Sequence, residues 1–481
     1  MKIQLCVVLA SSTFIAACGN SADNSSSTSA DNSAVITLTD APAVSAPGES
    51  VDLDESSGPT LSDGSTGDDG TSFPVLSDGA PAPGPAAESA DGGMATSPVE
   101  PVTPLPPVSI QPGTLSAGDY DDQLNPWLYQ QYSDNYLRNV RPQVNIPRLD
   151  LSGRIAIAVT DNANQPYAGA SVALLDAQGN TVGRLITPAN GIAYLYEDLD
   201  GLESEFTLRI TDRLGDISIM QSVALADITQ QRQLNFKLET IGTAHSELDL
   251  QLVIDTTGSM GDELNYLQTE LSSILNSIQN ANPQVSIRTG LVVYRDVGDQ
   301  YVVRSYPFTD NLADMQSALN GETFDGGGDY PEAMDQALEE ALTFQWREQS
   351  AKVMLLVADA PPHSHRVNAT WSSALTARSR QIHIVPVAAS GVAEDAEYLM
   401  RSMAALTHSR YLFLTDDSGV GNPHNEPDVD CYIVTRLDGL IRRVVNQLLT
   451  GIRTEPASNE IIRQTGEYDN GVCQSAQQEQ G

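Results

Sequence analysis

The sequence is poor in positive charge. It has 25 Lys and Arg residues against 63 Asp and Glu residues, which gives a formal net charge of −38 over 481 residues. No Lys or Arg occurs between Lys2 and Arg138. A protein this acidic is repelled by nucleic acid and by anionic lipid surfaces. The composition therefore argues against a nucleic-acid partner and suits cations or basic partners.

Cysteine is also scarce, with Cys6, Cys18, Cys431 and Cys473 as its four positions. None of them forms a CxxC pair, which excludes zinc sites of that kind. Long apolar runs are equally rare. The N-terminal stretch that follows Lys2 has the length of a signal-peptide core and is too short to span a bilayer.

That N-terminal stretch ends in Ile15-Ala16-Ala17-Cys18, which resembles the lipobox of bacterial lipoproteins. The resemblance implies a signal peptide over residues 1–17, cleavage before Cys18, and lipidation of Cys18 by acyl chains such as palmitate. Several acyl chains together would anchor the protein stably to a membrane. Gly19 resembles the pattern of outer-membrane sorting in a Gram-negative host. We therefore expect a cell-envelope protein, in the form of an outer-membrane lipoprotein that faces the periplasm or the surface. An ordinary signal peptide with an incidental cysteine is the alternative.

The two C-terminal cysteines remain once Cys18 is assigned to the lipid. An exported compartment is oxidising, so we expect a disulfide between Cys431 and Cys473. This bridge would tie the tail, residues 451–481, back to the domain that precedes it.

Aromatic residues are nearly absent from residues 18–117, which are rich in Ser, Asp, Gly, Pro and Ala. Such a segment cannot bury enough apolar surface to offset its ordering entropy, so a disordered linker is expected. It could serve as a tether or have no function. Residues 118–148 then bring aromatic side chains at helical spacing, which predicts a short helical lead-in.

Residues 149–240 show period-two alternation in short segments. A turn over residues 177–180 joins two of these segments and predicts a hairpin. Several short strands of this kind are typical of a β-sandwich. The region resembles Ig-like or carboxypeptidase-regulatory-like modules. It contains no His or Cys, so we interpret it as a spacer or support.

Residues 247–450 alternate apolar strands with amphipathic helices. The predicted strands are 248–254, 285–294, 352–358 and 382–388, and the predicted helices include 263–278, 331–344 and 393–406. This alternation predicts an α/β domain of the Rossmann-like kind, with a parallel sheet covered on both faces. Binding sites in such sheets lie beyond the carboxyl ends of the strands, and Asp255 is at such an end.

Three interpretations compete for "LVIDTTGSMG", residues 252–261, which places Asp255, Thr257 and Ser259 together. An aspartic protease needs a second D-[ST]-G turn on an all-β fold, and the only possible second copy is at residues 417–419. A helix capped by Ser259 explains one polar residue rather than three. A metal site explains all three, because hard divalent cations take oxygen ligands. It also predicts further oxygens at neighbouring strand ends, from Asp359 and Asp329.

These segments together resemble the metal-ion-dependent adhesion site of von Willebrand factor type A domains. The resemblance is carried by "VIDTTGSM", by the loop of Gly326, Gly327 and Gly328, and by "LLVADAPPH". It implies that Asp255, Thr257, Ser259, Asp329 and Asp359 bind Mg²⁺, or Mn²⁺ or Ca²⁺ in its place. Asp329 departs from the pattern, which usually has Thr there. Residues 329–332 also fit a capping box that opens the next helix.

The resemblance implies a binding or adhesion module that grips an unidentified protein partner through the cation. An envelope assembly factor or an accessory subunit of an enzyme complex is the alternative. No enzyme is expected, because no catalytic set is evident; only Glu332 and His363 could act as a base near the ion. His363 and His365 could suggest zinc, but the sequence offers no third nitrogen or sulfur ligand.

Overall fold

The computed structural model describes residues 113–140, 147–228, 232–328, 330–419 and 424–474. The predicted signal peptide, Cys18, Asp329 and nearly all of the predicted linker lie outside these residues. Within the described ranges, no helix combines the length and the apolar character that a membrane crossing requires.

The α/β domain is built on one large sheet whose strands follow the order β11-β10-β9-β12-β13-β14-β1-β15-β16. Five strands run parallel: β10 (Ser286–Tyr294), β9 (Glu247–Asp255), β12 (Ala351–Ala358), β13 (Ile382–Ala388) and β14 (Tyr411–Thr415). At one edge β11 (Val303–Thr309) is antiparallel to β10. At the other side β1 (Ser116–Tyr120) pairs antiparallel with both β14 and β15 (Tyr432–Arg436), and β16 (Arg463–Thr465) ends the sheet.

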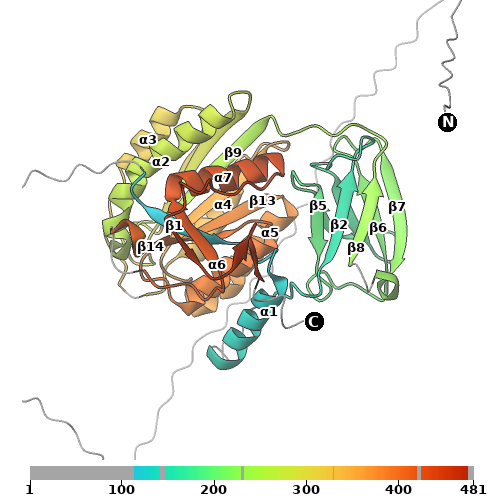
Figure 1. Cartoon of the computed structure of the whole chain (residues 1–481), viewed down its shortest axis with the longest axis horizontal. Coiled ribbons are helices and arrows are strands. Elements are labelled where there is room, and N and C mark those ends of the chain that lie inside the picture. Colours follow the sequence, from blue (N-terminus) through green and yellow to red (C-terminus); the bar gives the residue numbers. More distant parts are fainter. Residues whose placement is uncertain (1–112, 141–146, 229–231, 329, 420–423, 475–481) are drawn as a thin grey trace, which may run out of the picture. The chain divides into compact units, whose positions relative to one another are not determined.

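Helices cover both faces of this sheet (Figure 1). One face carries α2 (Gly261–Ala281), α3 (Leu312–Asn320) and α7 (Leu437–Thr450), and the other carries α4 (Met334–Thr343), α5 (Val367–Ser379) and α6 (Glu394–Leu406). Side chains alternate between the two faces along β9, so this strand contributes to both apolar cores. Leu252 and Ile254 pack on the first face, and Val253 packs on the second. The predicted fold class is confirmed.

The sequence pattern does not indicate strand β1, and the predicted end of the disordered linker at residue 117 is wrong, because Ser116 and Ala117 are buried in this strand. Strand β1 is short and contains a glycine, yet it lies between β14 and β15 in the sheet. Gly118 is required there, because a Cβ atom would come within 2.5 Å of the Phe413 ring. Helix α1 (Pro126–Asn135) follows, as predicted, with Tyr129 fully buried and its hydroxyl 2.8 Å from that of Ser402.

One helix start differs from the prediction. Helix α4 begins at Met334 with Ala333 as its N-cap and without a side-chain cap, so the capping-box interpretation of residues 329–332 is wrong. The reason is that Glu332 is extended: its backbone N–H donates to the Pro361 carbonyl at 3.0 Å, and it forms a β-bridge with Pro362.

The β-sandwich is confirmed as two facing sheets with a shared apolar core. One sheet has the order β5-β2-β8, formed by Ile192–Leu195, Ile155–Thr160 and Gln233–Lys237. The other has the order β4-β3-β6-β7, formed by Thr181–Ile186, Ser171–Leu175, Glu205–Thr211 and Ser218–Ala224. The predicted hairpin joins β3 to β4, and Gly179 takes the positive φ of 84° that this turn requires.

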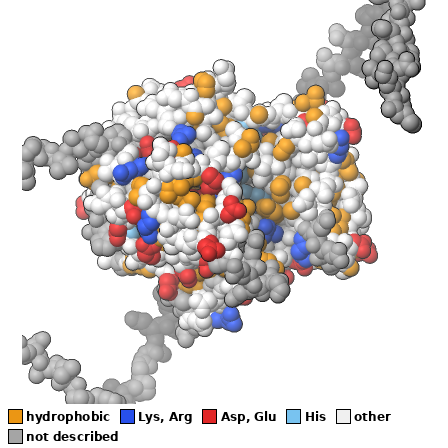
Figure 2. Space-filling model, in the orientation of Figure 1, with side chains coloured by type: hydrophobic (Ala, Val, Ile, Leu, Met, Phe, Trp, Pro, Cys, Tyr) orange, Lys and Arg blue, Asp and Glu red, His pale blue; other side chains and the backbone are white. Residues whose placement is uncertain are grey.

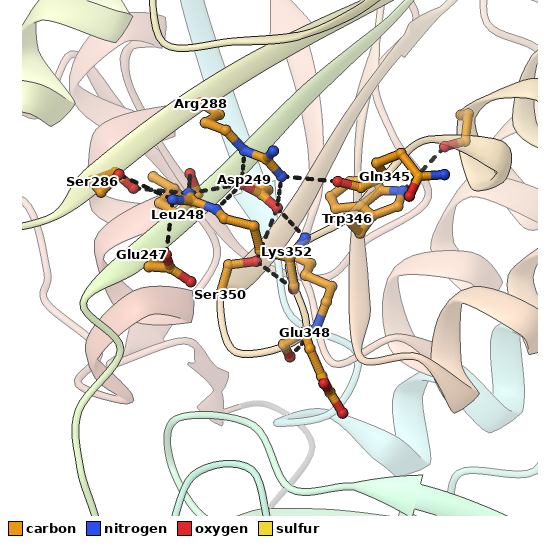
Figure 3. A network of polar contacts seen from close by, with 12 residues as sticks. Glu247, Leu248, Asp249, Ser286, Arg288, Gln345, Trp346, Glu348, Ser350 and Lys352 are labelled. Carbon is orange, nitrogen blue, oxygen red and sulfur yellow. Dashed lines mark hydrogen bonds and ion pairs between the residues drawn. The ribbon is translucent and has the colours of Figure 1, made fainter. Parts of the chain in front are cut away.

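A buried polar network holds the amino end of β9 (Figure 3). The Asp249 carboxylate is fully buried and accepts hydrogen bonds from Arg288 Nη2 at 2.8 Å, Arg347 Nε at 2.8 Å and Ser350 Oγ at 3.1 Å. Burial alone would raise the pKa of Asp249, but these arginine hydrogen bonds hold it below its ordinary value. The carboxylate is therefore ionised and compensated, and it ties β9 to β10 and to the segment before β12.

The surface mixes charges of both signs. Acidic, basic and apolar side chains are interspersed on the face drawn in Figure 2. The exposed large apolar side chains are Leu124, Trp127, Val182, Leu214, Met220, Ile241, Val297, Tyr330, Ile452 and Ile462. Most are isolated, which is ordinary for a protein surface. Val297 and Tyr330 are different, because they belong to loops at the carboxyl edge of the large sheet.

The predicted disulfide between Cys431 and Cys473 is present in the structure. Cys431 precedes β15, and Cys473 ends the small hairpin of β17 (Tyr468–Asp469) and β18 (Val472–Cys473). Both cysteines are buried. The bridge closes a segment with a sequence separation of 42 residues.

Removing this bridge should destabilise the protein. In the chain-entropy model a loop of this length stabilises the folded state by up to about 4 kcal/mol. The double variant Cys431→Ala, Cys473→Ala should therefore unfold at a lower urea concentration than wild type. Reduction of wild type should have the same effect, and reduction of the double variant should have none. Equal unfolding midpoints for oxidised and reduced wild type would contradict this prediction.

Candidate metal centre

The carboxyl ends of neighbouring parallel strands bring the predicted site residues together. In the β9–β12 register Ile254 pairs with Val357, so Asp255 and Asp359 lie one and two residues beyond the last pair. In the next register Ala358 pairs with Ala388, which brings the loop after β13 to the same edge. Asp255 and Asp359 interact electrostatically, as this register requires. The sheet thus places two predicted ligands at one edge.

The turn after β9 surrounds the Asp255 carboxylate with hydroxyl groups. Asp255 Oδ1 accepts from the Thr257 backbone N–H at 3.0 Å and from Thr257 Oγ1 at 2.7 Å. Thr257 Oγ1 lies 3.2 Å from Ser259 Oγ. Asp255 and Thr257 are fully buried, whereas Ser259 is exposed in the short helix η3 (Gly258–Met260). Ser259 makes no helix-capping hydrogen bond, so the capping interpretation has no support here.

One oxygen of Asp255 is only weakly compensated. Within the described residues its buried Oδ2 atom makes no hydrogen bond of normal geometry, and neither does the buried Tyr294 hydroxyl, although Tyr294 acts as a weak donor that partly offsets the rise in the pKa of Asp255 caused by burial. Burying an ionised carboxylate in this way is costly. A cation beside Oδ2 would remove that cost.

The glycine loop, residues 326–328, packs closely against its surroundings, as predicted. This holds for Gly326 and Gly327 but not for Gly328. A Cβ atom on Gly326 would lie 2.4 Å from the Asp299 carboxylate, and one on Gly327 would lie 2.7 Å from Glu332 Oε1. Both glycines have positive φ values, 82° and 67°. A Cβ atom on Gly328 would meet no neighbouring atom, so packing does not require glycine at this position. The Gly327 backbone N–H donates to Asp299 Oδ2 at 2.9 Å, which fixes the loop against the segment after β10.

Tyr330 links the glycine loop to the other strand ends. Its hydroxyl donates to the Asp359 carbonyl at 3.3 Å and accepts from the Ala393 N–H at 2.8 Å. Together these loops enclose a cavity of about 370 Å³. Its lining residues are Ser259, Gly326, Gly327, Gly328, Tyr330, Glu332, Asp359, Ala360, Ser390 and Gly391. The cavity is therefore built from four separate loops at one end of the sheet.

Negative charge concentrates around this cavity. Burial and the neighbouring Asp359 raise the pKa of Asp255 to about 7, against the opposing effect of the Thr257 hydrogen bonds. Burial raises the pKa of Glu332 to about 9, and Asp255, Asp296, Asp359 and Asp299 add to the shift. Without a cation, the site therefore binds protons unusually well.

The residues fit a hard divalent cation by their donor type. Two carboxylates, Asp255 and Asp359, stand beside two hydroxyls, Thr257 and Ser259, and Mg²⁺ prefers such oxygen ligands. Within the described ranges, no set of three or more His, Cys, Asp or Glu residues has the arrangement of a metal cluster. The described donors are thus two acids and two hydroxyls, and the predicted contribution of Asp329 lies outside the described residues.

His363 has a partner of its own. Its Nε2 atom lies 2.7 Å from Asp296 Oδ1, and the rings of His363 and His365 are 5.8 Å apart. His365 is exposed, and neither histidine belongs to a described metal cluster. The contact positions His363 against the loop after β10 and gives no support to zinc.

The sequence reasoning did not place three features of the site. It named Glu332 only as a possible base, and it did not identify Tyr330 or the loop of Ser390. The position of Ser390 could have been found, because it follows β13 as Asp359 follows β12. The inward position of Glu332 depends on the bridge to Pro362, for which the local sequence gives no signal.

Residues 249–424 match the family model described as von Willebrand factor A domain, so the chain contains such a domain. An ariadne-like RING finger protein of Acanthamoeba polyphaga mimivirus is 34% identical over 122 residues, covering 25% of this chain and 12% of that protein. An alpha-protein kinase of Dictyostelium discoideum is 23% identical over 136 residues, covering 28% and 22%. The chain thus matches about an eighth of the RING finger protein and about a fifth of the kinase. The activities of these relatives are therefore not assigned to this chain.

Two solved structures overlap with the chain at a low level. The pilus adhesin SpaC from Lactobacillus rhamnosus GG, in an open conformation, has a TM-score of 0.31 at 14% identity, covering 51% of this chain and 32% of SpaC. Manganese-loaded TRAP protein from Plasmodium vivax has a TM-score of 0.25 at 14% identity, covering 40% and 89%. Overlaps of this size do not establish a function.

Replacing Asp255 by Asn should stabilise the cation-free protein at neutral pH. Burial and the neighbouring Asp359 raise the folded-state pKa of Asp255 from its ordinary 3.8 to about 7, so wild type loses stability as the pH rises between these values. Asn keeps the oxygen that Thr257 contacts and removes the charge. In EDTA, Asp255→Asn should therefore melt several degrees above wild type at pH 8, with the difference shrinking toward pH 4. Equal melting temperatures at pH 8 would contradict the prediction.

Proposed function

We propose that the von Willebrand factor A domain is a cation-dependent protein-binding module. The observation that carries this proposal is the fully buried Asp255 carboxylate, whose Oδ2 atom makes no hydrogen bond of normal geometry within the described residues. It lies at the same sheet edge as a second acid, Asp359, and two hydroxyl residues. Burying the Asp255 carboxylate beside a second acid is costly to the stability of the fold, and a bound cation would offset that cost.

Asp255, Thr257, Ser259 and Asp359 would hold the cation, which is Mg²⁺ or, in its place, Mn²⁺ or Ca²⁺. Asp329 remains a proposed additional ligand. When bound, the cation supplies a positive centre that attracts an anionic oxygen of a partner. Mg²⁺ prefers six ligands, so four protein residues leave coordination positions for water or for a partner's carboxylate. Ser259 is exposed, which leaves one side of the site open.

The rim of the site supports a protein partner in particular. Val297 is 63% exposed in the loop after β10, and Tyr330 is 43% exposed in the glycine loop. Tyrosine is enriched in protein interfaces, and an exposed valine beside it would add apolar contact area. A partner that offers a carboxylate to the cation would contact both side chains.

We further propose that Cys18 anchors the module to a membrane of the cell envelope through its lipid. Support comes from residues 15–18 and from the acidic linker that follows them. In this arrangement the sandwich would act as a spacer. It is joined to the α/β domain by an ion pair, in which Arg378 of α5 donates to both carboxylate oxygens of Asp200 in the sandwich at 2.8 Å.

The proposal predicts that cation binding and partner binding fail together. Wild type and Asp359→Asn should be titrated calorimetrically with Mg²⁺ after removal of metals by EDTA, and then used to capture proteins from an envelope extract. Wild type should bind one ion and should capture a protein in Mg²⁺ but not in EDTA. Asp359→Asn should lose both activities, because one of the two described carboxylates is neutralised. Glu339→Gln, on the exposed face of α4, is the matched control. Capture that is equally strong in EDTA would contradict the proposal.

The rim residues should separate partner binding from cation binding. Val297→Ala removes exposed apolar area without touching a proposed ligand, so Mg²⁺ affinity should stay within about twofold of wild type. Affinity for the captured partner should fall by about tenfold if Val297 is an interface anchor, which corresponds to roughly 1.4 kcal/mol. Leu214→Ala, on the sandwich and 75% exposed, is the control and should change neither. Equal partner affinities for Val297→Ala and wild type would remove this loop from the interface.

A further inference from the structure

Glu332 is a buried acid at the cavity that the five predicted ligands do not include. Glu332 is 3% exposed and lines the cavity together with Ser259 and Asp359, and its Oε2 atom has no hydrogen-bond partner among the described residues. An unpartnered carboxylate oxygen at a cation site points to a ligand of that site. The inference drawn from it rests on the proposed cation binding.

The backbone holds Glu332 in this position from both sides. Its N–H donates to the Pro361 carbonyl at 3.0 Å, in the loop that also carries Asp359. On the other side, only the backbone of Gly327 separates it from the turn after β9. A Cβ atom on Gly327 would lie 2.7 Å from Glu332 Oε1 and 3.1 Å from Thr257 Cβ. The Glu332 carboxylate is therefore fixed beside a proposed ligand.

Every charged group that acts strongly on Glu332 is acidic. These groups are Asp255, Asp296, Asp359 and Asp299, and no Lys or Arg side chain within the described ranges bonds its carboxylate. By contrast, the buried Asp249 of the same domain is bonded by two arginines. Glu332 thus lacks an internal counter-charge, and the cation is the positive group that the cavity is suited to receive.

We propose that Glu332 is an outer-sphere residue of the cation site: it accepts a hydrogen bond from a water molecule that the cation holds. Direct ligation is not supported, because Asp255, Asp359 and Glu332 do not form a three-acid metal cluster in the structure. Mg²⁺ loses its water reluctantly and keeps several molecules in protein sites. A water between the cation and Glu332 would satisfy Oε2 and orient the coordination shell.

This role makes Glu332 a positioning residue for the hydrated cation. Outer-shell partners of this kind typically contribute 10- to 100-fold to metal affinity, on the order found in other sites. Glu332→Gln keeps the shape and one acceptor oxygen but removes the charge. It should therefore weaken Mg²⁺ binding by roughly 10-fold or more. Asp325→Asn removes the same charge from an exposed residue of the same loop, whose Oδ1 accepts from the Gly326 N–H at 3.0 Å.

The test is calorimetric titration of Mg²⁺ into metal-free full-length wild type, Glu332→Gln and Asp325→Asn. A loss of roughly 10-fold or more in Glu332→Gln, with less than about threefold in Asp325→Asn, supports the proposal. Equal losses in both variants would show a general charge effect and overturn it. Unchanged affinity in Glu332→Gln would also overturn it and leave the cation site intact. No binding by wild type would instead refute the proposed function itself.

A melting curve in EDTA separates this role from a folding role. Glu332→Gln replaces a buried acid that lies among other acids with a neutral amide of the same shape, so the cation-free variant should melt at or above the wild-type temperature. The increase in melting temperature on adding Mg²⁺ should then be smaller in the variant than in wild type. A variant that melts lower in EDTA, yet gains as much from Mg²⁺ as wild type does, would make Glu332 a purely structural residue.

Discussion

The buried Asp255 carboxylate is the constraint on which the site depends. A carboxylate at a strand end, fully removed from solvent, needs a positive partner or a proton. Thr257 satisfies one of its oxygens, and within the described chain the other has no hydrogen bond of normal geometry, with Tyr294 only a weak donor. The neighbouring Asp359 makes the ionised state still less favourable. A divalent cation would resolve both problems at once, and the glycine loop and the exposed Ser259 leave space for it.

The two ends of β9 each carry a buried acid, and the two acids differ in their charged neighbours and in the direction of their pKa shifts. At the amino end, Asp249 is bonded by Arg288 and Arg347 and has a lowered pKa. At the carboxyl end, Asp255 has no arginine partner among the described residues and has a raised pKa. Both residues are fully buried on the same strand, so burial alone does not explain the difference. The arginines make the first end a structural anchor, whereas the proposed cation would supply the missing positive charge at the second.

Much of this could be predicted from the sequence, because hydrophobic periodicity encodes which faces are buried. The four predicted parallel strands and the amphipathic helices over residues 263–278 and 393–406 are present in the structure. The strand-end rule correctly brought Asp255 and Asp359 to one edge. The pairing of Cys431 with Cys473 followed from the small number of cysteines.

The remaining features depend on contacts between distant segments. Strand β1 is short and contains Gly118, and it pairs with β14 and β15, which are about 300 residues away, where the Phe413 ring leaves no room for a side chain at position 118. The start of α4 at Met334 is set by the hydrogen bond from Glu332 to Pro361, in a loop some thirty residues away. The same bond turns Glu332 toward the cavity. The local sequence of residues 329–332 favours a capping box, but the hydrogen bond between Glu332 and Pro361 prevents it.

The most direct test of the central claim is the location of the cation itself. Crystals grown with Mn²⁺ would show the ion by its anomalous scattering. The account predicts one strong peak at the carboxyl ends of β9 and β12, at roughly 2.2 Å from oxygen atoms of the Asp255 turn, as expected for a hard cation with oxygen ligands. A protein that binds Mn²⁺ in solution but places the peak elsewhere, or places none near Asp255 and Asp359, would contradict it.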